Sequence, residues 1–117
     1  MVTWSDIETF AIALGGVEAS ISYGEPSLKI GKALLTRFRV SDNSAVLRSV
    51  DFDERDDLIS AHPDIFFVED HYLSHDIVLA RLEHAALDDV APYIRRTLAR
   101  LAGKRARNMG TKRMHPL

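Results

Sequence analysis

The stretch from Ile65 to Leu82 constrains the fold of this chain most, because it holds two short apolar runs on either side of a polar segment. The runs cover residues 65–68 and 77–80. Runs this short, rich in β-branched and aromatic side chains, favour buried strands over helices. The polar segment between them carries His71, Tyr72 and His75. We therefore expect two strands with a polar connection between them.

Four more strands are expected upstream, over residues 19–23, 27–30, 33–40 and 45–50, with short turns rich in glycine, proline and small polar residues between them. Connections this short make neighbouring strands antiparallel. If the last turn covers residues 41–44, Arg37 faces Arg48, and Arg37 and Arg39 lie on the opposite side from Phe38 and Val40. Like charges directly opposite each other destabilise a hairpin. Arg37 and Arg48 therefore need either an acidic neighbour within the chain or an external anion, and the sequence leaves both possibilities open.

Three helices complete the predicted order. The first helix has two candidate caps, Thr3 and Ser5, each with an acid at the capping-box spacing, and it ends at Gly15-Gly16. The second covers residues 51–61 behind an Asp51 cap. The third runs from about Asp89 to Gly103 and has one apolar and one basic stripe. The order α-β-β-β-β-α-β-β-α predicts an α+β fold in which an antiparallel sheet is covered on one face by helices.

The charge of the chain is divided unevenly, although the net charge is only −2. Residues 1–89 hold all 17 acidic and 7 of the 15 basic residues, whereas residues 90–117 hold 8 basic residues and no acid. A basic end of this kind can bind polyanions. We expect a single domain over residues 1–104, followed by a flexible basic tail over residues 105–117.

Composition excludes several classes of function. The chain has no cysteine, so disulfides, iron–sulfur clusters and thiol catalysis are excluded and a cytoplasmic location is expected. No apolar run reaches the ~20 residues of a membrane helix. No phosphate-binding glycine loop or dinucleotide fingerprint is present. We therefore expect no cofactor and no membrane partner.

The histidine segment resembles a reactive site but lacks the motifs of one. His71 and His75 are four residues apart, yet the HExxH pattern of zinc enzymes is absent. Ser74 has no nucleophile-elbow glycines around it, so no catalytic residue is predicted. Bonding of the histidines to backbone or carboxylate groups within the fold is the favoured interpretation. The alternative is a ligand site formed by His71, Tyr72 and His75.

Six short motifs, taken in order and spacing, resemble the MmcQ/YjbR family of small bacterial proteins over residues 4–104. They are ALGGVE at 13–18, SYGEP at 22–26, KIGK at 29–32, HPDIFF at 62–67, HY at 71–72 and IVLARL at 77–82. The resemblance implies a YjbR-like double-wing α+β fold and a DNA-binding role. The family label is an inference from shape, and fold alone does not determine function.

The resemblance carries no catalytic residues, but it implies that strand hairpins act as wings. The expected phosphate contacts are the basic residues of these wings and of the C-terminal helix: Lys29, Lys32, Arg37, Arg39, Arg48, Arg95, Arg96, Arg100, Lys104 and Arg105. Such contacts supply affinity without sequence choice, and no helix has the side chains that read bases. We expect weak, nonspecific, salt-dependent DNA binding by a monomer or weak dimer. The alternative is a non-catalytic module that binds a protein or a small ligand.

Overall fold

The computed structural model describes the backbone of residues 1–114 and the side chains of residues 1–104. Within this part of the chain, helices and strands follow one another in the predicted order, with one short 3₁₀ helix added between the last two strands. The elements are α1 (Trp4–Ala13), β1 (Glu18–Ser22), β2 (Glu25–Ile30), β3 (Ala33–Arg39), β4 (Ser44–Arg48), α2 (Phe52–Ala61), β5 (Phe66–Phe67), η1 (Asp70–Tyr72), β6 (Ile77–Arg81) and α3 (Leu87–Met114).

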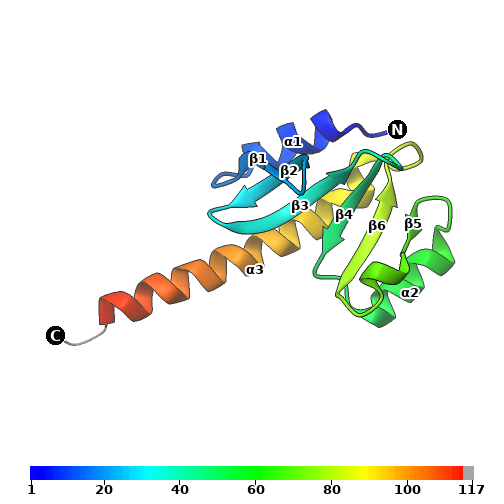
Figure 1. Cartoon of the computed structure of the whole chain (residues 1–117). Coiled ribbons are helices and arrows are strands. Elements are labelled where there is room, and N and C mark those ends of the chain that lie inside the picture. Colours follow the sequence, from blue (N-terminus) through cyan, green and yellow to red (C-terminus); the bar gives the residue numbers. More distant parts are fainter. Residues whose placement is uncertain (115–117) are drawn as a thin grey trace.

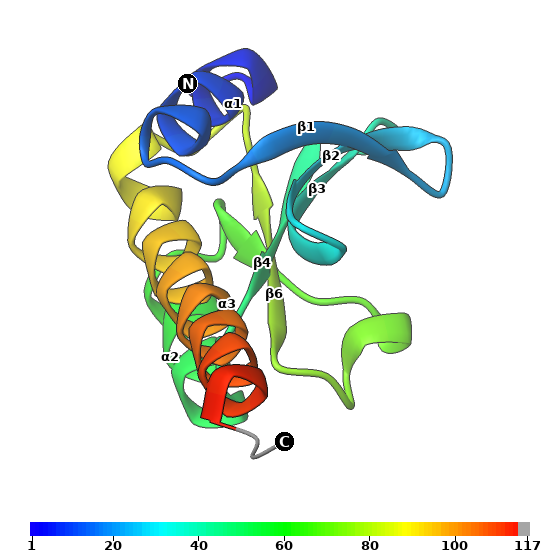
Figure 2. The same cartoon turned by 90° about the vertical axis from the view of Figure 1, so that its left-hand side faces the viewer.

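The strands form one antiparallel sheet in the order β1-β2-β3-β4-β6-β5. The helices lie on one side of this sheet, and the segment that contains η1 lies on the other (Figure 2). The predicted α+β class is confirmed. One face of the sheet is thus covered by α1, α2 and α3, and the other face, called the open face below, has only the β1–β2 hairpin and the η1 segment beside it.

Side-chain caps explain where the first two helices begin. The hydroxyl of Thr3 accepts a hydrogen bond of 3.1 Å from the amide of Asp6, whose carboxylate accepts one of 2.9 Å from the amide of Thr3. This reciprocal pair is a capping box. The carboxylate of Asp51 accepts a hydrogen bond of 2.8 Å from the amide of Glu54 at the start of α2. The predicted Asp51 cap is confirmed, and of the two candidate caps of α1 the structure uses Thr3, since Ser5 lies inside the helix.

The pairing of β3 with β4 differs from the predicted register by two residues. Arg37 pairs with Val46 and Phe38 with Ala45, so Arg37 does not face Arg48. The turn is formed by residues 40–43, because Asn43 takes a left-handed conformation (φ 52°) and Ser44 already belongs to the strand. A shift of two residues keeps every side chain on its predicted face. Arg37, Arg39 and Arg48 therefore still share the open face.

The C-terminal helix is longer than predicted. The sequence predicts an end near Gly103, whereas the helical backbone continues to Met114. Glycine costs a helix only about 1 kcal/mol relative to alanine, and the arginine, lysine, alanine and methionine residues that follow are strong helix formers. α3 consequently extends well beyond the body of the protein (Figure 1). The predicted flexibility of residues 105–117 is untested, and residues 115–117 lie outside the described backbone.

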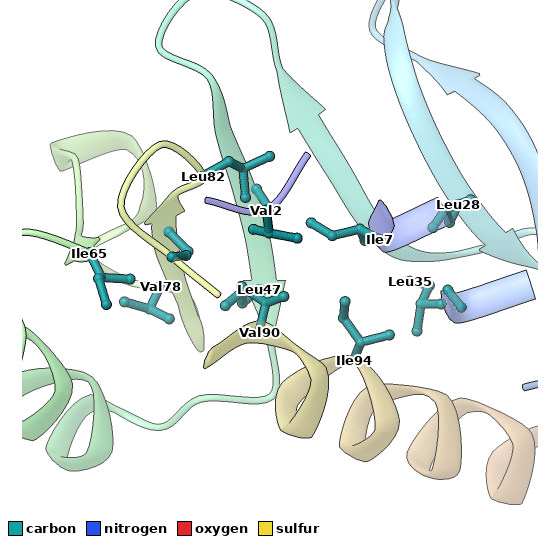
Figure 3. Packing of buried hydrophobic residues seen from close by; sticks show 14 of the residues in the cluster. Val2, Ile7, Leu28, Leu35, Leu47, Ile65, Val78, Leu82, Val90 and Ile94 are labelled. Carbon is teal, nitrogen blue, oxygen red and sulfur yellow. The ribbon is translucent and has the colours of Figure 1, made fainter. Parts of the chain in front are cut away.

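The core lies between the helices and the covered face of the sheet (Figure 3). Leu28, Leu35 and Leu47 of the sheet meet Ile7 of α1 and Ile94 of α3 there, and all five are essentially fully buried. Burial of a side chain of this size stabilises a fold by about 1.5–3 kcal/mol. The covered face is therefore occupied by the fold itself. None of the described helices is both long and apolar enough to cross a membrane.

Candidate functional site

The open face of the sheet carries a cleft of about 700 Å³, called the open-face cleft below. Its floor is formed by Leu34, Val46 and Ile77. One wall is the end of the β1–β2 hairpin, and the other is the η1 segment. The remaining lining consists of polar and aromatic side chains: Tyr23, Glu25, Arg37, Arg39, Ser41, Arg48, Glu69, His71, Tyr72 and His75. The structure thus brings the predicted wing arginines and the predicted histidine segment into one cleft.

Arg55 holds the histidine segment in place, a role that is not predictable from the sequence pattern. It is only 5% exposed, and its guanidinium donates hydrogen bonds to four main-chain oxygens of this segment. The acceptors are the carbonyl groups of Tyr72 (3.3 Å), Leu73 (3.0 Å), His75 (2.9 Å) and Ile77 (3.2 Å). A buried carbonyl needs such a partner. The only signal in the sequence is that Arg55 is the one basic residue of an acidic helix.

Arg37 joins the two walls of the cleft. Its guanidinium lies 2.5 Å from Glu25 in β2 and donates a hydrogen bond of 2.5 Å to the hydroxyl of Tyr72 in η1. Charge-assisted hydrogen bonds are about twice as strong as neutral ones. The acidic neighbour that the sequence analysis required for Arg37 is therefore Glu25.

Arg39 is paired in the same way. It contacts Asp42 at 3.1 Å and Glu69 at 3.0 Å, and its guanidinium carbon lies 6.0 Å from the centre of the Tyr72 ring. Burial lowers the pKa of Arg39, but the hydrogen bond to Glu69 and the charges of both acids outweigh burial and raise it. Two of the predicted phosphate contacts, Arg37 and Arg39, thus have carboxylate partners within the chain.

Arg48 differs from its neighbours because no carboxylate of the described side chains lies within ion-pair distance of it. Its guanidinium donates a hydrogen bond to the carbonyl oxygen of Leu34. Burial, together with the nearby charge of Arg100, lowers the pKa of Arg48. Arg48 also lines a second cavity of about 350 Å³, formed with Ser49, His75, Arg100 and other residues between the sheet, α2 and α3.

The basic side chains of α3 fall into two groups. Arg96 makes a two-point contact with Glu54 of α2 (2.6 and 3.1 Å), and this hydrogen bonding raises its pKa. Arg95 is exposed and lies over the ring of Phe10 at 5.0 Å, while Lys104 is exposed. Of the wing lysines, Lys29 is half-buried and Lys32 is exposed. The side chain of Arg105 lies outside the described side chains.

The histidines do not hold the fold together through their rings. His71 and His75 are exposed, and neither ring makes a hydrogen bond with any described side chain or main-chain group. Among the described residues, His71 and His75 take part in hydrogen bonds only through their main-chain groups, such as the His75 carbonyl group that accepts a hydrogen bond from Arg55. The favoured interpretation of structural histidines is therefore wrong for these side chains. Across the described residues no group of three or more His, Cys, Asp or Glu is placed to bind a metal ion.

Comparison with known proteins finds no match to this chain among protein-family models, curated proteins or solved structures.

Proposed function

We propose that this chain is a member of the MmcQ/YjbR family and binds nucleic acid weakly and without sequence preference, chiefly through α3. The observation that carries the proposal is the charge of this helix and the residues after it: 8 basic residues and no acid from Val90 onward. The helix leaves the body of the protein (Figure 1), so a polyanion has access to it. Lysine and arginine contacts with phosphates displace counterions and need no particular base sequence.

Ion pairs within the fold leave only some of the predicted basic residues free to bind phosphate. Arg37 and Arg39 already have carboxylate partners, and a phosphate would have to compete with Glu25 and Glu69 for them. Arg96 is likewise engaged by Glu54. Arg95 and Lys104 are exposed, and neither has an acidic partner among the described side chains. We therefore propose that Arg95 and Lys104, rather than the basic residues of the wings, make the main phosphate contacts among the described side chains. The absence of cysteine is compatible with a reducing cytoplasm, which is the location that we propose.

The test is a fluorescence-anisotropy titration of labelled duplex and single-stranded DNA at several salt concentrations. It compares the full chain with an Arg95→Gln/Lys104→Gln variant and with a Lys29→Gln/Lys32→Gln variant, which removes the same charge from the β2–β3 hairpin. For duplex DNA the slope of log K against log salt changes by about 0.9 for each phosphate that the protein no longer neutralises. We expect weaker binding and a shallower slope for the α3 variant only.

Two results would contradict the proposal. An equal drop in affinity for the hairpin variant would move the phosphate-binding residues to the wings. No binding by the full chain at low salt would remove nucleic acid as the partner.

A further inference from the structure

Arg48 and Arg100 both line the second cavity of about 350 Å³, called the smaller cavity below, and neither has a carboxylate partner among the described side chains. Arg48 lies at the end of β4, and Arg100 lies on α3. Arg48 donates one hydrogen bond, to the Leu34 carbonyl oxygen, and the Nε of Arg100 donates one of 2.9 Å to the hydroxyl of Ser49. Each guanidinium has five N–H donors. Among the described residues, most donors of both groups are therefore left for another partner.

A network of buried groups sets the positions of these two side chains. The Oγ1 of Thr97, which is fully buried, lies 3.1 Å from the carbonyl oxygen of Arg48 and 3.0 Å from the Oγ of Ser49. Ser49 itself has a left-handed backbone (φ 64°). Such a conformation is unfavourable for a non-glycine residue and persists only where its surroundings enforce it. Ser49 thus acts as a positioning residue that ties Arg100 to the end of β4.

The acids that line the same cavity do not neutralise this pair. Glu54 is held by Arg96 at 2.6 Å, and Asp51 accepts the amide of Glu54 as the cap of α2. Asp76 also lines the cavity but lies beyond ion-pair distance of both arginines. The charge of Arg100 is one reason why the pKa of Arg48 is lowered. An anion between the two guanidinium groups would relieve their repulsion.

The cavity adjoins the open-face cleft, which has an apolar floor and mostly polar and aromatic walls. Arg48, His75 and Ile77 line both the smaller cavity and the open-face cleft, so the two spaces adjoin. The cleft floor beyond Arg48 is formed by Leu34 and Val46. Volumes of about 300–1,000 Å³ are typical of small-molecule sites. A bound molecule could therefore place an anionic group beside the arginines and an apolar part over this floor.

We propose that Arg48 and Arg100 bind the phosphate group of a small phosphate monoester whose apolar part lies in the open-face cleft over Leu34, Val46 and Ile77. A phosphate monoester carries a charge of about −1.5 to −2 at pH 7 and has three strong acceptor oxygens, which match two guanidinium groups. One planar carboxylate needs only one guanidinium fork. This site is separate from the α3 residues assigned to nucleic acid, Arg95 and Lys104.

The test is isothermal titration calorimetry of the full chain with phenyl phosphate, inorganic phosphate, benzoate and benzyl alcohol as probes. We expect phenyl phosphate to bind most tightly, because it alone offers both the phosphate and the apolar ring. Arg100→Gln should weaken its binding by about tenfold or more, because it removes a charge-assisted hydrogen-bond donor. Arg48→Gln should weaken binding in the same way. Because Arg100 is exposed, the Arg100→Gln variant should fold normally and keeps the test valid if the Arg48→Gln variant is unstable.

Two matched variants sharpen the result. Arg95→Gln removes the same charge from the same helix outside the cavity, so phenyl phosphate binding should not change. Asp76→Asn removes a competing negative charge from the cavity lining and should tighten binding. Conversely, Arg48→Gln should leave DNA anisotropy unchanged, so failure of this proposal can be told apart from failure of the nucleic-acid proposal.

Four outcomes would overturn the inference. They are no heat of binding up to about 10 mM phenyl phosphate, equal affinity for benzoate, equal affinity for inorganic phosphate, or an unchanged affinity in the Arg100→Gln variant. Chemical-shift changes in an amide NMR spectrum give a second measurement. Under the proposal they centre on residues 46–49 and 75–77.

Discussion

The guanidinium of Arg55 donates a hydrogen bond of 2.9 Å to the carbonyl oxygen of His75, and so ties α2 to the segment that forms one wall of the open-face cleft. The same guanidinium holds the carbonyl groups of Tyr72, Leu73 and Ile77. One buried side chain therefore supplies hydrogen-bond donors to main-chain carbonyl groups from the end of η1 to the start of β6. Its removal would leave several carbonyl groups without a donor at once.

We expect Arg55→Met to lower the free energy of unfolding by about 3 kcal/mol, because removal of a charged donor from buried acceptors is costly. Arg55→Lys keeps the charge but not the fork, so it should destabilise the protein less than the methionine variant does. Urea unfolding followed by the fluorescence of Trp4 measures both. Hydrogen exchange should show faster exchange in residues 70–77. An Arg55→Met protein as stable as the Arg95→Met control would contradict this role.

The pairing of Arg37 with Glu25 and Tyr72 predicts that substitutions here affect stability more than nucleic-acid binding. Tyr72→Phe removes one hydrogen bond of 2.5 Å and should cost about 0.5–1.5 kcal/mol of stability. Arg37→Gln should also destabilise the protein, yet it should lower DNA affinity less than Arg95→Gln. Urea unfolding and DNA anisotropy on the same samples test this prediction. A larger drop in affinity for Arg37→Gln would return the wings to the interface.

Ser49 combines a strained backbone with two useful side-chain hydrogen bonds, and two substitutions separate these effects. Ser49→Ala removes the hydrogen bonds with Thr97 and Arg100 but keeps the left-handed conformation. Ser49→Gly removes the same hydrogen bonds and also the steric cost of that conformation, which is about 1 kcal/mol or more. The glycine variant should therefore be the more stable of the two in thermal unfolding. Glycine also raises the entropy of the unfolded chain, by about 0.4–1 kcal/mol relative to alanine, so a glycine variant less stable than the alanine variant would show that the strain at Ser49 is smaller than this cost.

Local signals in the sequence were enough for the order of elements and for the faces of the sheet. The three-residue spacing of a cap and its acidic partner locates the start of α2 at Asp51 and narrows the start of α1 to Thr3 or Ser5, of which the structure uses Thr3. Arg37 and Phe38 fall on opposite faces of the sheet because side chains alternate along a strand. A register shift of two residues also keeps Arg37 and Arg48 on the same face. The error of two residues in the β3–β4 register therefore did not disturb the predicted faces.

Contacts between distant residues could not be predicted in this way. The sequence alone could not show that Glu25 pairs with Arg37 and leaves Arg48 without an acid. Glu25 and Arg48 are 23 positions apart in the sequence, and only the folded sheet determines which arginine the acid reaches. The same holds for Arg55, whose acceptors lie 17–22 residues away. The predicted end of α3 near Gly103 is wrong for another reason, because a single glycine costs a helix only about 1 kcal/mol and the helix formers on either side of it outweigh that cost.

The capping box of α1 gives a prediction about pH. The backbone and side-chain hydrogen bonds with Thr3 hold the pKa of Asp6 below its ordinary value of 3.8. Because the pKa is lower in the folded than in the unfolded protein, the ionised carboxylate stabilises the fold fully above pH 3.8, and this stabilisation disappears as pH falls through the folded-state pKa. The stability difference between the native chain and Asp6→Asn should therefore be present at about pH 6 and shrink toward about pH 2. Urea unfolding across this range, with carbon NMR titration of Asp6, checks both statements. Thr3→Ala should move the Asp6 pKa back toward 3.8, and an Asp6 that already titrates at 3.8 or above in the native chain would show that the capping box does not stabilise its charge.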